Sequence, residues 1–449
     1  MRKLVKGKLK FSYILFLFIA IIFSPNLYAE EENVELDKNI KNLSFSGFFR
    51  TRLWHFQSKN VFPGSFEDDI TEKYVTYQDL FLRNRFLLKV SSNIEIKTVF
   101  DIFTVFGESV INNIDTKGGA LGSAGINLKT RNLYLTYALL SQKMQFALGL
   151  QPFSLPGGYI LASDGTGIKM SYDIFKGFWN SYIYYIKAYD NSKENFGEGF
   201  GNYNFNDNDI YVWGSKTSFN ENYSLEFYYV YQKDLDLNYD ADWAKLNWVG
   251  CHNKFFINKY FIELALIYNS GKIREKTDDS ANNETTNVKA GLFDLWLGFR
   301  YEALEFALKV KGATGNITHR IHSNSFQDIR ASNSFTSLII DNTGGLSYRG
   351  SLYGILGQGI EIKYAFSNFE LLTRYVHFRT ANKINIQENK KSNYFGDEYE
   401  IQGKYNIEEY FSIFINGAVF NPNEAYTSIM QTDNKNHIYE FMIGGRVDY

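Results

Sequence analysis

The C-terminal segment 439–449 alternates between apolar and polar side chains and ends on an aromatic residue. Its odd positions carry mostly apolar side chains, whereas Glu440, Arg446 and Asp448 occupy even positions. Because side chains alternate across a β-strand, this pattern predicts one face toward lipid and the other toward an aqueous lumen. Such a strand is typical of the end of a bacterial outer-membrane barrel. An edge strand of a soluble β-sandwich is the alternative that this segment alone leaves open.

A basic stretch, an apolar stretch and a cleavage site follow one another at the N-terminus. The basic residues lie between Arg2 and Lys10, the apolar stretch runs from Phe11 to Phe23, and Leu27-Tyr28-Ala29 offers the cleavage site. This order predicts a secretory signal peptide over 1–29. An uncleaved anchor helix is the alternative, but the apolar stretch is short for a transmembrane helix, which needs about 20 residues.

We expect residues 30–449 to form one domain, a barrel preceded by a short periplasmic lead-in over 30–42. Beyond the leader no apolar run approaches the length of a transmembrane helix, so a membrane-spanning structure has to be built from strands. Aromatic residues make up 18% of the sequence, as expected of rings that gather at two membrane interfaces. The 5 prolines suit a fully paired sheet, and a single cysteine, Cys251, excludes an intrachain disulfide.

The sequence therefore predicts an all-β fold, a transmembrane antiparallel up-and-down β-barrel of about 18 strands. Short turns are expected on the periplasmic side after even strands, and long extracellular loops after odd strands. The predicted strands lie near 43–56, 78–90, 94–107, 127–140, 144–152, 165–174, 179–189, 209–219, 223–234, 242–256, 260–273, 287–301, 304–314, 354–366, 369–379, 397–406, 410–420 and 437–449. The predicted long loops are 57–77, 108–126, 190–208, 274–286, 315–353, 380–396 and 421–436.

Alternation within each predicted strand assigns charged side chains of both signs to the lumen. The predicted basic pore-lining residues, which would bind substrate, are Arg50, Arg52, Arg83, Arg85, Lys129, Arg131, Lys169, Lys309, Arg374 and Arg446. The predicted acidic pore-lining residues are Asp79, Glu95, Asp101, Glu361, Glu370 and Glu400.

Arginines crowd the first, second and fourth predicted strands, and we call Arg50, Arg52, Arg83, Arg85 and Arg131 the arginine sector. A functional interpretation is that these guanidinium groups bind carboxylates or phosphates, whose planar oxygens match the guanidinium fork. A structural interpretation is that arginines and carboxylates on neighbouring strands pair and stiffen the wall. Pairing is the interpretation we favour for Glu361 with Lys363 and for Glu400 with Lys404.

Two parts of the sequence resemble the alginate export family of outer-membrane barrels. The segments 396–405 and 411–422 are similar to that family's closing hairpin, and Phe49-Arg50-Thr51-Arg52 and Arg83-Asn84-Arg85-Phe86 are similar to its opening strands. The resemblance implies an eighteen-stranded pore whose electropositive constriction passes an anionic polysaccharide outward. One departure is Gly149-Leu150-Gln151, where family members often have Gly-Arg-Gln. A general or anion-selective diffusion porin, and a surface-interaction barrel with a plugged lumen, remain the alternatives.

The histidines form no recognisable catalytic or metal-binding set. His319 and His322 lie in the predicted loop 315–353 without a visible third ligand, and His377 is expected at a membrane interface. The segment 118–125 resembles a phosphate-binding loop only in glycine content, since no Lys-Ser/Thr pair follows it. No set of Ser, His and Asp converges in this register. We therefore expect no enzyme, no metal and no cofactor.

The expected location is the bacterial outer membrane, and the expected partners follow from it. They are outer-membrane lipid, small anions or an anionic saccharide, and the barrel-assembly machinery, which would recognise the C-terminal strand. Periplasmic export components would join them if the resemblance to exporters holds. Without the leader the chain has 42 Lys and Arg against 49 Asp and Glu, which argues against a nucleic-acid partner. The transported solute, its direction and the oligomeric state remain open.

The predicted loop 315–353 is apolar enough to fold back into the barrel and narrow it, because it contains Phe326, Phe335 and the run Leu338 to Ile340. We expect deletion of Asn324 to Asn342 to raise the single-channel conductance in planar bilayers. An unchanged conductance would exclude a role for this loop as a constriction or lid.

Overall fold

The structure, a computed structural model, describes residues 42–58, 73–106, 127–139, 143–175, 177–190, 207–220, 222–234, 241–275, 285–316, 325–326, 329, 354–387, 390–429 and 437–449. Residues from Leu43 to Tyr449 form one compact unit. The predicted signal peptide, and the predicted lead-in except for Asn42, lie outside the described residues. Within the described residues, no helix is both long enough and apolar enough to cross a membrane.

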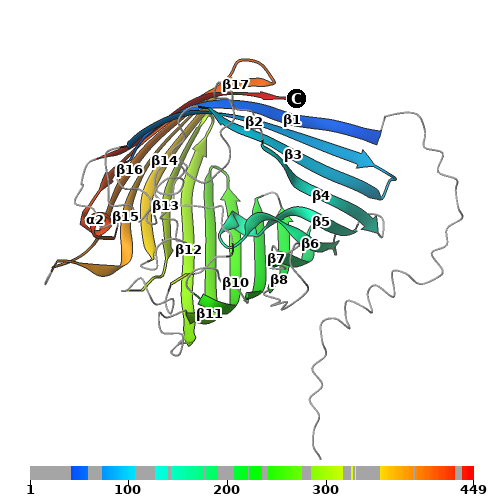
Figure 1. Ribbon diagram of the computed structural model, residues 1–449, viewed down its shortest axis with the longest axis horizontal. Coiled ribbons are helices and arrows are strands. Elements are labelled where there is room, and N and C mark those ends of the chain that lie inside the picture. Colours follow the sequence, from blue (N-terminus) through cyan, green and yellow to red (C-terminus); the bar gives the residue numbers. More distant parts are fainter. Residues whose placement is uncertain are drawn as a thin grey trace, which may run out of the picture. The chain divides into compact units, whose positions relative to one another are not determined.

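Eighteen antiparallel strands form one sheet in which each strand pairs with the next along the chain (Figure 1). The last strand pairs with the first, from Phe48 opposite Asp448 to Gln57 opposite Tyr439, and this pairing closes the barrel. The predicted fold class is confirmed. The strands are β1 Leu43–Ser58, β2 Lys73–Lys89, β3 Ile94–Phe106, β4 Asn127–Leu139, β5 Met144–Ser154, β6 Ala162–Asp173, β7 Trp179–Asp190, β8 Asp207–Asn220, β9 Tyr223–Asp234, β10 Ala241–Ile257, β11 Tyr260–Glu275, β12 Thr285–Tyr301, β13 Leu304–Ala313, β14 Ile355–Phe366, β15 Phe369–Gln387, β16 Lys390–Asn406, β17 Phe411–Pro422 and β18 Ile438–Asp448.

Short turns follow the even strands, as predicted, but one predicted long loop is wrong. Residues 380–396 are mostly strand, because β15 continues to Gln387 and β16 begins at Lys390. The extension is stable because side chains on its inner face are still buried, as Ile384 and Phe395 are. The sequence prediction mistook the Asn and Lys residues of this segment for a loop, although those that are exposed, such as Lys383 and Lys391, lie on paired strands.

Two short helical segments lie in connections. The 3₁₀ turn η3, Pro156–Gly158, connects β5 to β6, and the helix α2, Glu424–Ile429, connects β17 to β18. The ring of Tyr426 in α2 lies 5.2 Å from the ring of Phe395 and 5.2 Å from that of Phe420. The helix therefore packs its apolar side against the inner face of the β16–β17 wall.

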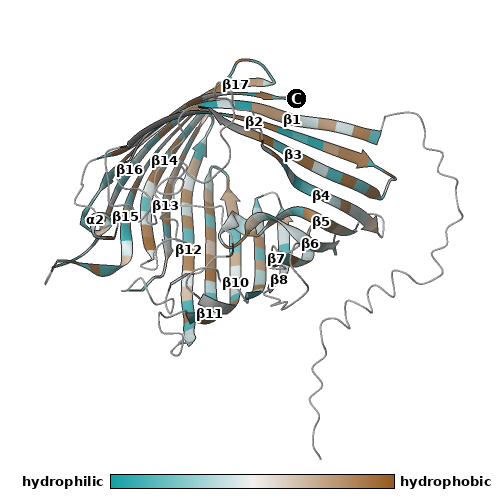
Figure 2. Cartoon of the chain, viewed as in Figure 1, coloured by the Kyte–Doolittle hydropathy of each residue, from teal (hydrophilic) through white to brown (hydrophobic). Residues whose placement is uncertain are grey.

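The outer face of the wall carries an apolar belt, which Figure 2 shows as apolar residues alternating with polar ones along each strand. Leu53, Leu266, Ile362 and Ile443 are typical members, each between 41% and 49% exposed. Their exposure is stable only in lipid, since a soluble protein rarely leaves so large an apolar area uncovered. The chain thus has the fold of a multi-pass bacterial outer-membrane β-barrel.

Inside the barrel, aromatic rings lie across glycines of the neighbouring strand. Tyr182 on Gly214, Tyr228 on Gly250, and Phe261 on Gly298 are examples, each joined by direct strand register. A Cβ at Gly250 would lie 2.1 Å from Cζ of Tyr228, so the ring occupies the space that a side chain would need. Covering glycine with a cross-strand aromatic ring shields the exposed backbone and fixes the register.

We predict that Gly250→Val lowers the free energy of unfolding by about 1–3 kcal/mol, because the new side chain displaces the buried ring of Tyr228. Urea unfolding of the refolded protein in detergent micelles would measure the change. Gly417→Val is the matched control, since a Cβ there lies 3.6 Å from Ile401 and fits the outer face. Equal stability of the two variants would contradict the prediction.

Candidate functional site

The inner face of the wall is divided into an apolar sector and a charged sector. Inner-face side chains in the half of β7 to β12 that lies toward the long loops form the apolar sector. They include Ile186, Val212, Val230, Trp248 and Leu292, each at most 4% exposed. A lumen that held only water would not bury such residues, so another part of the chain has to cover them.

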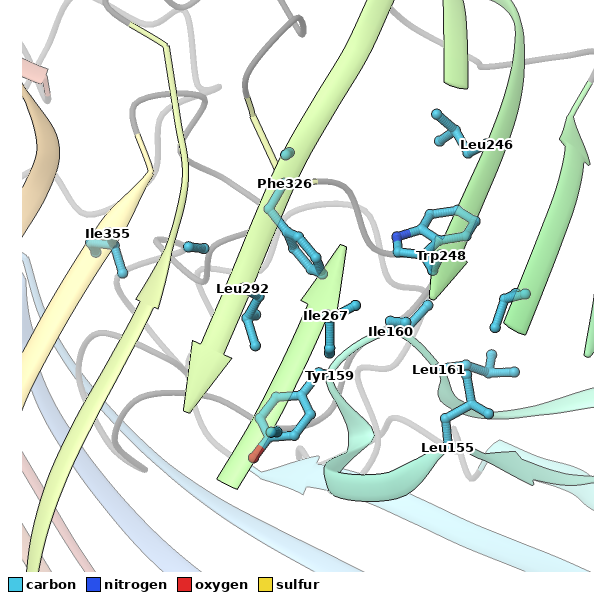
Figure 3. Close-up of a cluster of buried hydrophobic side chains, with 14 of the residues drawn as sticks. Leu155, Tyr159, Ile160, Leu161, Leu246, Trp248, Ile267, Leu292, Phe326 and Ile355 are labelled. Atoms are coloured by element: carbon cyan, nitrogen blue, oxygen red, sulfur yellow. The ribbon is translucent and has the colours of Figure 1, made fainter. Parts of the chain in front are cut away.

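The inner segment, defined as Leu155 to Leu161, covers the apolar sector. Figure 3 shows Tyr159 and Ile160 of this segment beside Ile267 and Leu292 of the wall. Leu155, Tyr159, Ile160 and Leu161 are each at most 3% exposed. Burying a Leu or Ile side chain contributes about 1.5–3 kcal/mol, so the connection between β5 and β6 is held inside the barrel rather than above it.

Two glycines allow the inner segment to turn back on itself. Gly157 has a φ of 67° and Gly158 a φ of 66°, values that other residues adopt only with strain. A Cβ at Gly157 would also lie 1.9 Å from the ring of Tyr159. The sequence prediction missed this segment, although a Pro-Gly-Gly turn between apolar residues was the signal that could have revealed it.

Tyr159 fixes the inner segment to the opposite wall. Its hydroxyl donates a hydrogen bond to Oδ2 of Asp294 over 2.7 Å, while the indole Nε1 of Trp296 donates to Oδ1 over 2.7 Å. Lys311 completes the contact, with Nζ 3.7 Å from the carboxylate and 4.8 Å from the Tyr159 ring centre. Burial, and then the Asp294 carboxylate, raise the pKa of the Tyr159 phenol. The phenol therefore remains a neutral donor at physiological pH.

The connection between β13 and β14 contacts the inner segment through backbone hydrogen bonds. The backbone N of Ile329 donates to the carbonyl of Ile160 over 3.0 Å, and that of Phe326 donates to the carbonyl of Thr314 over 3.1 Å. Phe326 is 2% exposed and belongs to the same apolar cluster (Figure 3). Of the predicted lid 315–353, the structure describes 315, 316, 325, 326 and 329; its other residues lie outside the described residues, as do His319, His322 and 118–125.

The charged sector begins on β13 to β16 with a chain of ion pairs. Nζ of Lys309 lies 2.6 Å from Oε2 of Glu361, which lies 2.5 Å from Nη2 of Arg374. Nη1 of Arg374 lies 3.1 Å from Oε2 of Glu400. A cavity of about 20 Å³ beside Lys309 and Arg374 leaves little room for a solute. In this part of the wall the charges pair with one another, but with other partners than predicted: Glu361 pairs with Lys309 and Arg374 rather than Lys363, and Glu400 with Arg374 rather than Lys404.

The arginine sector, on β1, β2 and β4, also contains ion pairs. Arg52 pairs with Asp79, and Nε of Arg83 lies 2.7 Å from Oδ1 of Asp101. Arg131 lies at the point where the register of β4 shifts against β3, and its Nε lies 2.8 Å from Oδ2 of Asp164. Asp164 was absent from the predicted residues, because sequence alternation does not show a carboxylate brought in from β6.

Other cations of this sector keep their charge available to the lumen. Arg50 lies opposite Arg446 on β18 and over the ring of Phe81, and within the described residues its Nε has no hydrogen-bond partner. Arg85 and Lys129 are exposed and form no ion pair within the described part of the chain. A charge that is not neutralised by a fixed carboxylate can attract a mobile anion.

The register places the predicted pore-lining residues on the inner face, except Arg131, which lies in the register shift between β3 and β4 and has no partner there. Arg446 pairs with Asp448 over 2.5 Å, and Lys169 contacts the rings of Phe153 and Tyr184. The predicted acidic residues Glu95 and Glu370 lie 3.1 Å from Lys97 and 3.8 Å from Lys363, respectively. Their role in substrate binding stays a prediction. No group of three His, Cys, Asp or Glu side chains within the described ranges could hold a metal ion.

No protein-family model matches the sequence, and no curated protein matches it either. Several solved structures share its fold. OccAB1 from Acinetobacter baumannii aligns with 94% of this chain and 99% of its own, with a TM-score of 0.57 and 13% identity. A BenF-like porin from Pseudomonas fluorescens Pf-5 aligns with 91% and 98%, with a TM-score of 0.53 and 12% identity. OccK9 (OpdG) from Pseudomonas aeruginosa aligns with 90% and 99%, with a TM-score of 0.55 and 10% identity.

The resemblance to the alginate export family is wrong, because the structures that match this fold are the BenF-like porin and Occ barrels. The reason is physical. Any barrel of this size needs outward aromatic residues and inward charged residues on strands of similar length. The short motifs that carried the resemblance contain little beyond that requirement, so they do not distinguish exporters from porins.

We predict that Tyr159→Phe lowers the free energy of unfolding by about 1–3 kcal/mol, because Asp294 loses a buried donor. Looser attachment of the inner segment should also increase current noise in single-channel recordings. Tyr229→Phe is the matched control, since Tyr229 donates to Asn247 on the exposed outer face. A Tyr159→Phe channel as quiet and as stable as the control would show that this contact does not fix the segment.

Proposed function

We propose that the protein is an outer-membrane diffusion pore that prefers small anionic solutes. The observation that carries the proposal is the set of inner-face cations that form no ion pair with another described residue, Arg50, Arg85 and Lys129, beside the ion pairs of the same sector. Guanidinium groups recognise carboxylates in a bidentate geometry and remain charged at all relevant pH values. The likeness in fold to a protein described as a porin supports a passive pore.

The position of the inner segment in the lumen favours the passage of small solutes over that of polymers. The segment places a packed apolar body, buried against β10 to β12, within the lumen. A solute in the lumen would therefore meet both this apolar body and the cations of β1, β2 and β4. Such a passage favours small amphipathic carboxylates over long hydrated chains, and the chemistry it offers is binding rather than catalysis.

We predict that the double substitution Arg50→Gln and Arg85→Gln shifts the reversal potential toward cation preference. The reason is that both charges face the lumen without a fixed counter-ion. The measurement is the reversal potential of the refolded protein in a planar bilayer under a potassium chloride gradient, then with potassium benzoate replacing chloride on one side.

Lys245→Gln is the matched control, because Lys245 is an exposed cation on the outer face of β10. Its removal should leave the reversal potential unchanged. A double variant with the selectivity of the control would contradict the assignment of Arg50 and Arg85. A wild-type protein that passes no current would favour the surface-interaction barrel instead.

A further inference from the structure

A row of polar side chains crosses the outer face of β14 to β18 at the upper end of the apolar belt. Strand register joins Gln358 to His377, His377 to Asp397, and Asp397 to Asn421. Nδ1 of His437 lies 2.5 Å from Oδ1 of Asn421 and continues the row. The row directly below it is apolar or aromatic throughout: Ile360, Tyr375, Tyr399, Val419 and Tyr439. This change marks the height at which lipid chains give way to lipid headgroups.

The polar row carries an ordered network centred on the Asp397 carboxylate. It accepts a hydrogen bond from the Tyr375 hydroxyl over 2.8 Å, another from Nδ1 of His377 over 2.9 Å, and a third from the Tyr394 hydroxyl. Nε of Arg379 donates to Nε2 of His377 over 2.9 Å. The hydrogen bond to His377 connects the exposed Arg379 guanidinium to this network.

Three cations stand at and above this network on the outer face of the β15–β16 hairpin. Arg379, Lys383 and Lys391 are exposed, and none forms an ion pair with another described residue. Arg379 lies opposite Tyr394, and Lys391 opposite Asn385. Lys383 alternates with the buried Ile384 and therefore points away from the lumen. We call these three residues the outer basic cluster.

An apolar groove of about 640 Å³ lies below the polar row, with Tyr375 and Tyr399 at its upper end, and the outer basic cluster begins on the far side of that row at Arg379. Its outer-face lining includes Ile362, Tyr375, Ile401, Val419 and Phe441, and its floor lies at Gly417. The groove exists because Gly417 has no side chain between large neighbours: a Cβ there would meet its nearest atom only at 3.6 Å. The groove and the cluster together offer one ligand an apolar channel and a cationic end.

We infer that this outer face binds a phosphorylated glycolipid of the outer leaflet. Its acyl chain would lie in the groove, and its phosphate would contact the outer basic cluster. The charge complementarity is direct, since three cations without fixed counter-ions stand where headgroup phosphates lie. The ring and hydroxyl of Tyr394, with His377, supply the polar and aromatic surface that a sugar needs. The inference does not rest on the proposed pore function.

Native mass spectrometry of the delipidated full-length protein in detergent tests the inference. Diphosphoryl lipid A is the probe, and phosphatidylethanolamine, which has acyl chains but no net charge, is the comparison. We expect lipid A to bind at one site. The triple substitution Arg379→Ala, Lys383→Ala and Lys391→Ala should weaken its binding about tenfold. Equal binding of both lipids would overturn the inference.

Two further variants separate a site from general surface charge. Gly417→Leu fills the groove without a backbone clash, so it should weaken lipid A binding while the basic cluster stays intact. Lys245→Ala, Lys272→Ala and Lys289→Ala remove three exposed cations from the outer face of β10 to β12 and should leave binding unchanged. An equal loss in this control, no loss in Gly417→Leu, or a second copy of the chain bound in place of lipid would each overturn the assignment.

Discussion

Everything in this structure depends on the pairing of β18 with β1. In hydrocarbon no water can satisfy an open strand edge, and each unsatisfied backbone group costs several kcal/mol. The C-terminal residue takes part directly: the N of Gly47 donates to the Tyr449 carbonyl over 2.8 Å, and the N of Tyr449 donates to the Gly47 carbonyl over 3.1 Å. Closure then fixes the register of all eighteen strands, and the register decides which side chains face lipid and which face the lumen.

The lumen has to be partly filled, so that it selects solutes, and it also has to stay open for their passage. A barrel of eighteen strands encloses more space than its wall side chains fill, and an open space of that size would not select a solute. The inner segment fills one sector by packing apolar residues against the wall, and Tyr159 ties it to Asp294 on β12. The arginine sector carries ion pairs of Arg52 and Arg83 that support the wall, and under the function proposed above Arg50 and Arg85 act on passing ions.

The outer surface also changes in chemical character along its height. An apolar belt meets lipid chains, a row of tyrosines marks its upper end, and cations stand above the tyrosines on the extended β15–β16 hairpin. That hairpin rises beyond the belt, where its backbone is already paired and its outer side chains are free to contact headgroups. The wall therefore offers distinct surfaces on its two faces, one for solutes and one for lipid.

The sequence by itself determined the barrel, its strand order and the direction of most side chains, because alternation with a period of two is imposed locally by the strand. It could not place the inner segment, since covering the apolar sector brings this segment against strands as distant as β12, where Asp294 is 135 residues from its partner Tyr159. It also could not assign ion-pair partners such as Asp164 for Arg131, nor show that 380–396 continues two strands. Those features depend on which surfaces closure brings together, and only the tertiary structure decides that.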